Sequence, residues 1–111
     1  MTADQDPPFS VDVHLEGAMV AVDLLGELDY ATVPHFTSAM ARVASDHPAT
    51  AVRINLGSLD FIDSSGMSAL MSAHADTAAR GAKLTVVRGP ARVQRPLEVI
   101  GMEQILEFVD P

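Results

Sequence analysis

Apolar and polar residues alternate between positions 9 and 16, which is typical of a strand with one buried face. The apolar members of this alternation are Phe9, Val11, Val13 and Leu15. Glu16-Gly17 is a turn-forming pair, and the following residues 19–25 are apolar except for Asp23. The pattern therefore predicts a second, more buried strand that runs back antiparallel to the first.

Two long segments have the spacing of helices instead. After Thr32, a candidate N-cap with Pro34 in the first turn, apolar residues recur every three or four positions until His47-Pro48. A second run with the same spacing predicts a helix that ends at Arg80, with Gly81 just beyond its C-terminus.

Shorter elements fill the rest of the chain. Pro90 opens a short helix that Gly101 closes, and Pro96 inside it removes one backbone hydrogen bond, which predicts a kink. Residues 57–60 are rich in turn-forming types and predict a turn. The three remaining predicted strands are residues 51–56, 84–87 and 105–109.

The elements follow the order β-β-α-β-α-β-α-β, which predicts a single α/β domain. Strands that alternate with helices pair in parallel through right-handed crossovers, and the opening hairpin makes the small sheet mixed. We expect this domain to span residues 9–111, after a flexible N-terminal tail of residues 1–8. With 111 residues, of which 48% are apolar, the chain is long enough for one hydrophobic core.

The composition excludes several classes of function. The chain has no cysteine, so disulfides, thiolate metal sites and thiol redox chemistry are absent. No apolar run approaches the ~18 residues of a membrane span, and the acidic, polar start does not resemble a secretory signal, so we expect a cytoplasmic protein without a membrane partner. The net charge of −8 repels a polyanion, so no direct nucleic-acid partner is expected.

The basic residues are unevenly distributed. Five of the seven lie between Arg80 and Arg95, whereas the acidic residues dominate the first third of the chain. Such a stripe would suit an acidic partner, but a solvated face is the more frequent explanation of a charge run, and we favour it here.

The candidate chemistry lies in Asp63-Ser64-Ser65-Gly66, at the start of the second helix. Free backbone N–H groups and the helix dipole favour an anion at such a position. Asp and Ser are also ordinary N-caps, so the tetrapeptide alone predicts capping first. A second polar turn contains Glu27 and Asp29 and also joins a strand to a helix. If the two strands are neighbours, these acids lie near Ser64, although a solvated acidic turn is equally consistent with them.

Two other kinds of site are disfavoured. A hydrolase with Ser64 as nucleophile needs a base, and His35 would have to lie against it; the Gly-x-Ser-x-Gly elbow and a Walker-type glycine loop are both missing. No two of the four histidines have metal-ligand spacing supported by a third ligand, so we predict no metal and no cofactor. His74, on the apolar stripe of the second helix, is interpreted as a packed residue. The histidines are His14, His35, His47 and His74.

Two motifs together resemble a known family. The segments 25–29 (LGELD) and 59–67 (LDFIDSSGM), with VIGM at 99–102 before the last strand, resemble the STAS domain of bacterial anti-sigma factor antagonists over about residues 9–110. The resemblance implies that Ser64 is phosphorylated by a kinase that is also the anti-sigma factor. The unphosphorylated antagonist binds that kinase and frees a sigma factor, and a serine phosphatase acting on phosphorylated Ser64 resets the switch.

We expect a partner-binding surface around the phosphoacceptor. Ser65 shapes the site and is a secondary acceptor, Asp63 positions the Ser64 hydroxyl, and Gly66 allows the kinase a close approach. Glu27 and Asp29 form an acidic lip. The expected partner-binding residues are Glu27, Asp29, Asp63, Ser65, Gly66, Met67 and Ser68, of which Met67 is mostly a core residue.

The chain departs from the family at its end, because members usually finish with a further helix after the last strand. This sequence stops at Asp110-Pro111, so that helix is expected to be absent, which leaves part of the sheet less covered and leaves room for a weak homodimer. Two alternatives to the sigma-factor switch stay open. One is an interaction module of a larger, stressosome-like sensory assembly, and the other is a ligand-binding or lipid-transport accessory domain that does not use Ser64.

Overall fold

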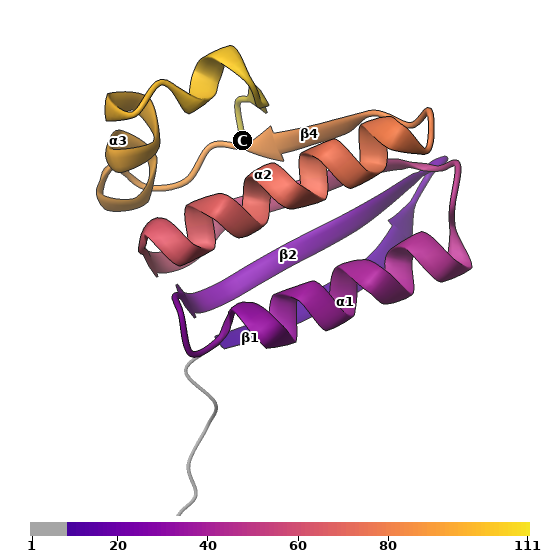
Figure 1. Ribbon diagram of the computed structural model, residues 1–111, viewed down its shortest axis with the longest axis horizontal. Coiled ribbons are helices and arrows are strands. Elements are labelled where there is room, and N and C mark those ends of the chain that lie inside the picture. The colour runs from indigo at the N-terminus through magenta and orange to yellow at the C-terminus, as the bar shows by residue number, and fades with distance from the viewer. Residues whose placement is uncertain (1–8) are drawn as a thin grey trace, which may run out of the picture.

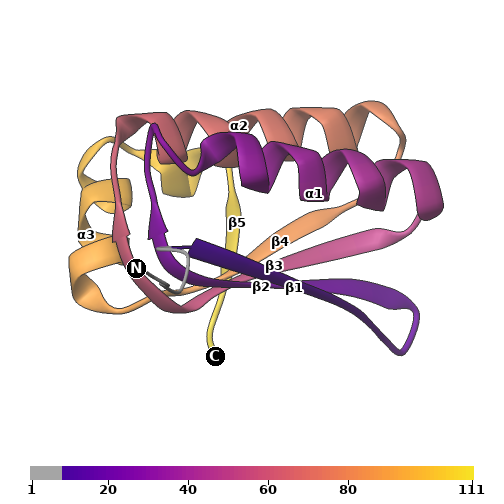
Figure 2. The same ribbon diagram turned by 90° about the horizontal axis from the view of Figure 1, so that it is seen from below.

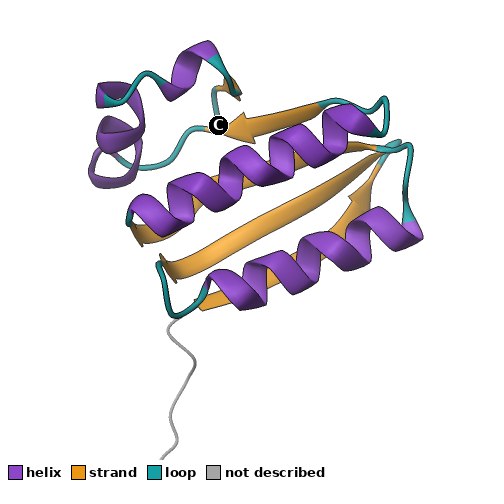
Figure 3. Cartoon of the chain, viewed as in Figure 1, coloured by secondary structure: helices purple, strands orange, loops and turns teal. Residues whose placement is uncertain are grey.

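A computed structural model describes residues 9–111, so the tail expected at residues 1–8 lies outside the described residues (Figure 1). The elements are β1 (Phe9–Glu16), β2 (Met19–Leu28), α1 (Val33–Asp46), β3 (Ala51–Ile62), α2 (Ser64–Ala79), β4 (Leu84–Val87), α3 (Ala91–Val99), the 3₁₀ helix η1 (Met102–Gln104) and β5 (Glu107–Val109) (Figure 3). The predicted element order is confirmed, and η1 is an addition that the sequence pattern did not predict.

The strands form one sheet in the order β1-β2-β3-β4-β5. β1 pairs antiparallel with β2, and all other pairs are parallel, which confirms the predicted mixed sheet. Helices α1 and α2 lie side by side on one face of this sheet, and α3 lies at one end of it (Figure 2). Within residues 9–111, no helix covers the opposite face of the strands, which we call the open face.

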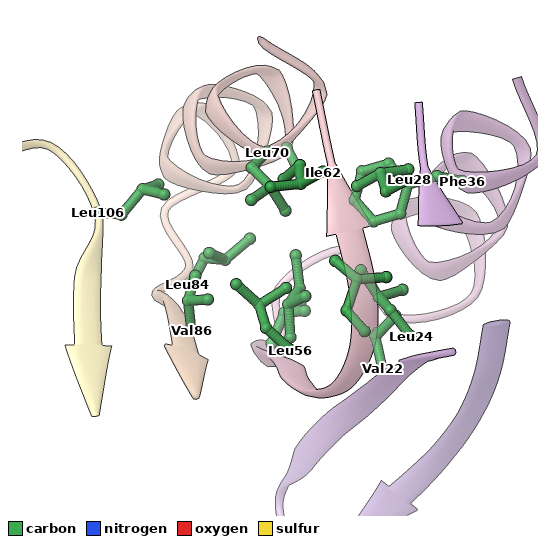
Figure 4. Close-up of a cluster of buried hydrophobic side chains, with 14 of the residues drawn as sticks. Val22, Leu24, Leu28, Phe36, Leu56, Ile62, Leu70, Leu84, Val86 and Leu106 are labelled. Carbon is green, nitrogen blue, oxygen red and sulfur yellow. The ribbon is translucent and has the colours of Figure 1, made fainter. Parts of the chain in front are cut away.

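The core lies between the sheet and the two long helices. Side chains that point from the strands toward α1 and α2 are fully or almost fully buried, as are the inward residues of the helices (Figure 4). Each such aliphatic or aromatic side chain contributes about 1.5–3 kcal/mol when it leaves water. Representative members are Val22, Leu24, Leu56, Leu84, Val86, Phe36 and Leu70.

The turn predicted at residues 57–60 is wrong. β3 continues through these residues to Ile62, beside β2, and the pairing shifts twice, between Asp23 and Leu25 and between Gly26 and Glu27 of β2. The turn-forming residues are taken up as irregularities of the strand because β2 still offers a hydrogen-bonding edge there. As a result, the end of β3 stays paired with the end of β2, and the two polar segments that follow them are held together.

The helix ends agree with the predicted signals. Gly81 and Gly101 follow α2 and α3 with φ angles of +76° and +80°, a conformation that favours glycine. Thr32 is the N-cap of α1, but its hydroxyl makes no capping bond and instead donates to the Glu27 carbonyl at 2.7 Å. α3 is a nine-residue helix that contains Pro96, as expected, and no helix follows β5 in residues 9–111.

The open face is covered in part by its own long side chains. Ala21 of β2 lies there between His14 of β1 and Arg53 of β3, and it is 0% exposed. Arg53 pairs with Glu16 across β2, and His14 lies 3.6 Å from Glu16. Polar side chains therefore shield this face where helices do not. None of the described helices is both long and apolar enough to cross a membrane.

Candidate phosphoacceptor site

The ends of β2 and β3 meet at Asp63, which ties the two polar segments together. Its Oδ1 accepts a hydrogen bond from the Gly66 N–H (2.9 Å), and its Oδ2 accepts one from the Tyr30 N–H (3.1 Å). Its own N–H donates to the Leu28 carbonyl at 3.2 Å. The expected N-cap role of Asp63 is confirmed, and the same carboxylate also fixes the turn after β2.

Ser64 is the first residue of α2 and is exposed. Within residues 9–111 its hydroxyl forms no hydrogen bond to another residue, because the Asp63 carboxylate accepts from the backbone N–H groups of Gly66 and Tyr30 instead. The neighbouring Ser65 is half-buried and Ser68, one turn later, is exposed, and both line a groove between α1 and α2. Of the two serines at the start of α2, Ser64 is therefore the more accessible.

Gly66 has a packing role that the sequence did not predict. The residue is buried, and a Cβ atom there would lie 2.4 Å from the Leu28 carbonyl oxygen and 2.8 Å from Cγ1 of Ile62. Contacts this short are repulsive, so the glycine allows the start of α2 to pack on the end of β2. The absence of a side chain therefore serves packing inside the protein, and the expected role in the approach of a kinase stays a prediction.

The two acids of the expected lip are not equivalent. Asp29 is half-buried, and its Oδ1 accepts hydrogen bonds from the backbone N–H groups of Ala31 (3.0 Å) and Thr32 (3.1 Å). This is an Asx turn that shapes the loop before α1. Glu27 is exposed and pairs through its backbone with Phe61, so it is the acid of the two that remains available to a partner.

The sequence pattern missed several exposed apolar side chains next to the site. Tyr30 is 81% exposed directly after Asp29, and Phe61 is exposed on β3 three residues before Ser64. Met67, which was expected at the partner-binding surface, is half-buried and lines an open groove with α3, and the exposed Val99 also borders this groove. The sequence did contain one indication of this surface. Tyr30 is an aromatic residue within a polar turn, where an exposed side chain is expected.

The basic stripe is mostly neutralised within the chain, which supports its interpretation as a solvated face. Arg92, next to the site, pairs with the Asp60 carboxylate at 3.0 Å. Arg88 lies 3.4 Å from Glu98, and Lys83 lies 3.2 Å from Glu107 on β5.

The described histidines pack or pair elsewhere than the arrangement that a hydrolase with Ser64 would need for His35. His35 packs edge-on against Phe9 on β1, with ring centroids 5.7 Å apart. The ligand atoms of His14, Asp12 and Asp23 all lie within 4.8 Å of one another on the open face. The sequence analysis considered pairs of histidines, so it did not predict this grouping of one histidine with two carboxylates from two strands.

The sequence and the fold of this chain are similar to those of known proteins. A family model described as the STAS domain matches residues 10–110. An anti-sigma factor antagonist from Mycobacterium paratuberculosis superposes with a TM-score of 0.81 at 22% identity, covering 90% of this chain and 84% of that one. The Bacillus cell fate determinant SpoIIAA in its phosphorylated form gives 0.71 at 17% identity, with coverage of 92% and 91%.

The fold also occurs inside much larger proteins. The murine Solute Carrier 26 family member A9 anion transporter matches with a TM-score of 0.66 at 14% identity, covering 91% of this chain but 19% of the transporter. At such identities the structures share the fold, whereas the family model spans nearly the whole sequence. This chain belongs to the STAS domain family.

Proposed function

We propose that this protein is an anti-sigma factor antagonist whose binding to its anti-sigma factor is controlled by phosphorylation of Ser64. The observation that carries the proposal is an exposed serine at the first position of α2, held at the meeting point of the two polar segments by Asp63. The structural likeness to anti-sigma factor antagonists supports it.

The chemistry assigned to Ser64 is that of an acceptor. The kinase partner transfers the γ-phosphoryl group of ATP to the Ser64 hydroxyl oxygen, ADP leaves, and the hydroxyl proton passes to a base of the kinase. A phosphatase reverses the step with water and releases inorganic phosphate. The antagonist itself only presents the Ser64 hydroxyl to the kinase. This hydroxyl is exposed and forms no hydrogen bond to another of the described residues.

The phosphate would act on the interface through its charge. A phosphoserine carries about −1.5 to −2 charges at neutral pH. The helix start favours this charge by roughly 0.3–1 kcal/mol, because the first N–H groups point toward it. A like charge of a partner at about 4 Å costs ~4 kcal/mol per pair of unit charges at an effective dielectric of 20. The isolated domain therefore tolerates the phosphate, and an interface with an acidic rim does not.

The surroundings of Ser64 add to this effect. Glu27 is exposed on β2, and Arg92, a nearby cation on α3, is already paired with Asp60. A net loss of about 3 kcal/mol weakens a complex by about two orders of magnitude. The proposal thus describes a change of affinity without a change of fold.

A binding experiment with four chains tests the proposal. The wild type and the variants Ser64→Ala, Ser64→Asp and Ser38→Asp are used to retrieve partners from a host lysate, followed by mass spectrometry. Ser38 is exposed on α1 and does not belong to the expected partner-binding residues, so its variant controls for added charge alone. We expect an ATP-binding serine kinase to be retained by every chain except Ser64→Asp.

The other outcomes separate the alternatives. If all four chains retain the same kinase, a negative charge at Ser64 does not control binding, and the proposed phosphorylation switch is wrong. If the chains retain sensory or transport proteins and no kinase, the domain is an interaction module, as the shared fold with a transporter domain allows. Incubation of the retained kinase with ATP and wild-type chain, then peptide mapping, identifies the modified serine.

A further inference from the structure

The outer edge of β1 is the longest strand edge that the described chain leaves open. β1 has eight residues and pairs with β2 in an unbroken register from Phe9 to Glu16. Within residues 9–111 no strand pairs with its other edge. Every second residue of such a strand points its N–H and C=O groups away from the sheet, toward solvent or another chain. β1 contains no proline and no bulge, which are common means of blocking an edge.

The side chains of β1 add apolar surface to this edge. Val13 is 42% exposed and Leu15 is 61% exposed, both on the face that carries the helices. Together with Val11, they line a groove of about 610 Å³ between β1 and α1, whose far wall includes Ala39 and Val43. We propose that this edge is a homodimer interface, at which β1 of a second copy of this chain pairs antiparallel with β1.

The charge pattern of β1 complements a second copy of the same strand and favours some registers over others. In a continuous sheet with a two-fold axis perpendicular to it, residues opposite each other must lie on the same face, so an even-numbered residue faces an even-numbered one. Centring the pair on residue 12 places Asp12 opposite its own copy, and centring it on residue 14 places Asp12 opposite Glu16. Both arrangements bring two carboxylates together, which destabilises a strand pair.

Centring the pair on Val13 removes this conflict and keeps seven residues paired. Asp12 then lies opposite His14 of the second copy, which donates a hydrogen bond whether or not it is protonated. Val11 lies opposite Leu15, and Val13 lies opposite its own copy at the axis. The polar pairs fall on the open face and the apolar pairs beside the groove. Among the registers that keep the carboxylates apart, this one pairs the most residues of the strand.

The absence of cysteine makes the register directly testable. In the full chain carrying Val13→Cys, two cysteines meet at the two-fold axis, at a separation that a disulfide spans. Leu25→Cys is the matched control, because Leu25 is 44% exposed on β2 and lies away from the edge. We expect mild oxidation to cross-link the Val13→Cys chain at least about tenfold faster than the control.

Analytical ultracentrifugation provides a second measurement that does not depend on disulfide geometry. The wild type is expected to dimerise with rising concentration, and Val13→Lys to weaken the dimer at least about tenfold by placing two cations opposite each other, whereas Leu25→Lys leaves it unchanged. Circular dichroism checks that each variant folds. A monomer at concentrations up to about 1 mM, or a dimer that forms equally well with Val13→Lys, overturns the proposal.

Discussion

At the scale of single residues, Gly66 connects the packing of the domain to its candidate site. Its missing side chain leaves room for the Leu28 carbonyl, which a Cβ atom would approach to 2.4 Å. Gly66→Ala would therefore shift the start of α2, and the cost of overpacking, about 1–3 kcal/mol, exceeds the gain of about 0.5–1 kcal/mol from the better helix propensity of alanine. We expect the free energy of unfolding, measured in urea, to fall by about 1 kcal/mol or more.

Ser68→Ala is the matched control for this prediction. Ser68 is exposed on the same helix, so its substitution is expected to change the free energy of unfolding by no more than about 0.5 kcal/mol. Equal stability of the Gly66→Ala chain and the wild type would mean that the close contact with Leu28 relaxes without cost.

At the scale of elements, an ion pair joins the strands of the open face. The Arg53 guanidinium on β3 hydrogen-bonds the Glu16 carboxylate on β1 and holds the pKa of Glu16 below its ordinary value, with a smaller contribution from His14. Because the pKa is lowered by folding, this pair stabilises the fold above the ordinary pKa of glutamate, and the stabilisation is lost as the pH falls through the lowered value. The pair is exposed, so its effect on stability is small.

An NMR titration of Glu16 measures this shift directly. We expect Arg53→Gln to raise the pKa of Glu16 toward its ordinary value, because the main cause of the lowered pKa is removed. Lys83→Gln removes a cation that pairs with Glu107 on β5, and it should leave the Glu16 titration unchanged. An unchanged Glu16 titration in Arg53→Gln would show that the ion pair does not persist in solution.

At the scale of the whole molecule, the proposed switch requires that phosphorylation of Ser64 leave the stability of the fold nearly unchanged. Ser64 is exposed, and the opposing effects of the helix start and the neighbouring acids are each modest in water. We expect phosphorylation of Ser64 to change the free energy of unfolding by less than about 1 kcal/mol, as measured by urea denaturation of both forms. A loss of more than about 2 kcal/mol would point to release by local unfolding instead.

The sequence predicted the site's components better than their roles. Asp63 was expected to cap α2 and does so, because capping depends on residues within one helical turn. The packing role of Gly66 was not predicted, because its contact with Leu28 joins residues far apart in the chain. Asp29 was expected to face a partner, yet its carboxylate shapes its own turn.

The type and order of the strands and long helices, and the family resemblance, can be inferred from the sequence alone, because periodicity, caps and turn residues act over a few neighbouring positions. Which residues meet in space depends on the tertiary structure. The strand ends lie together because β3 continues along β2 past residues 57–60, and the open face joins Asp12, His14 and Asp23 across two strands. Strand register is a long-range property, set by core packing and backbone pairing over the whole sheet.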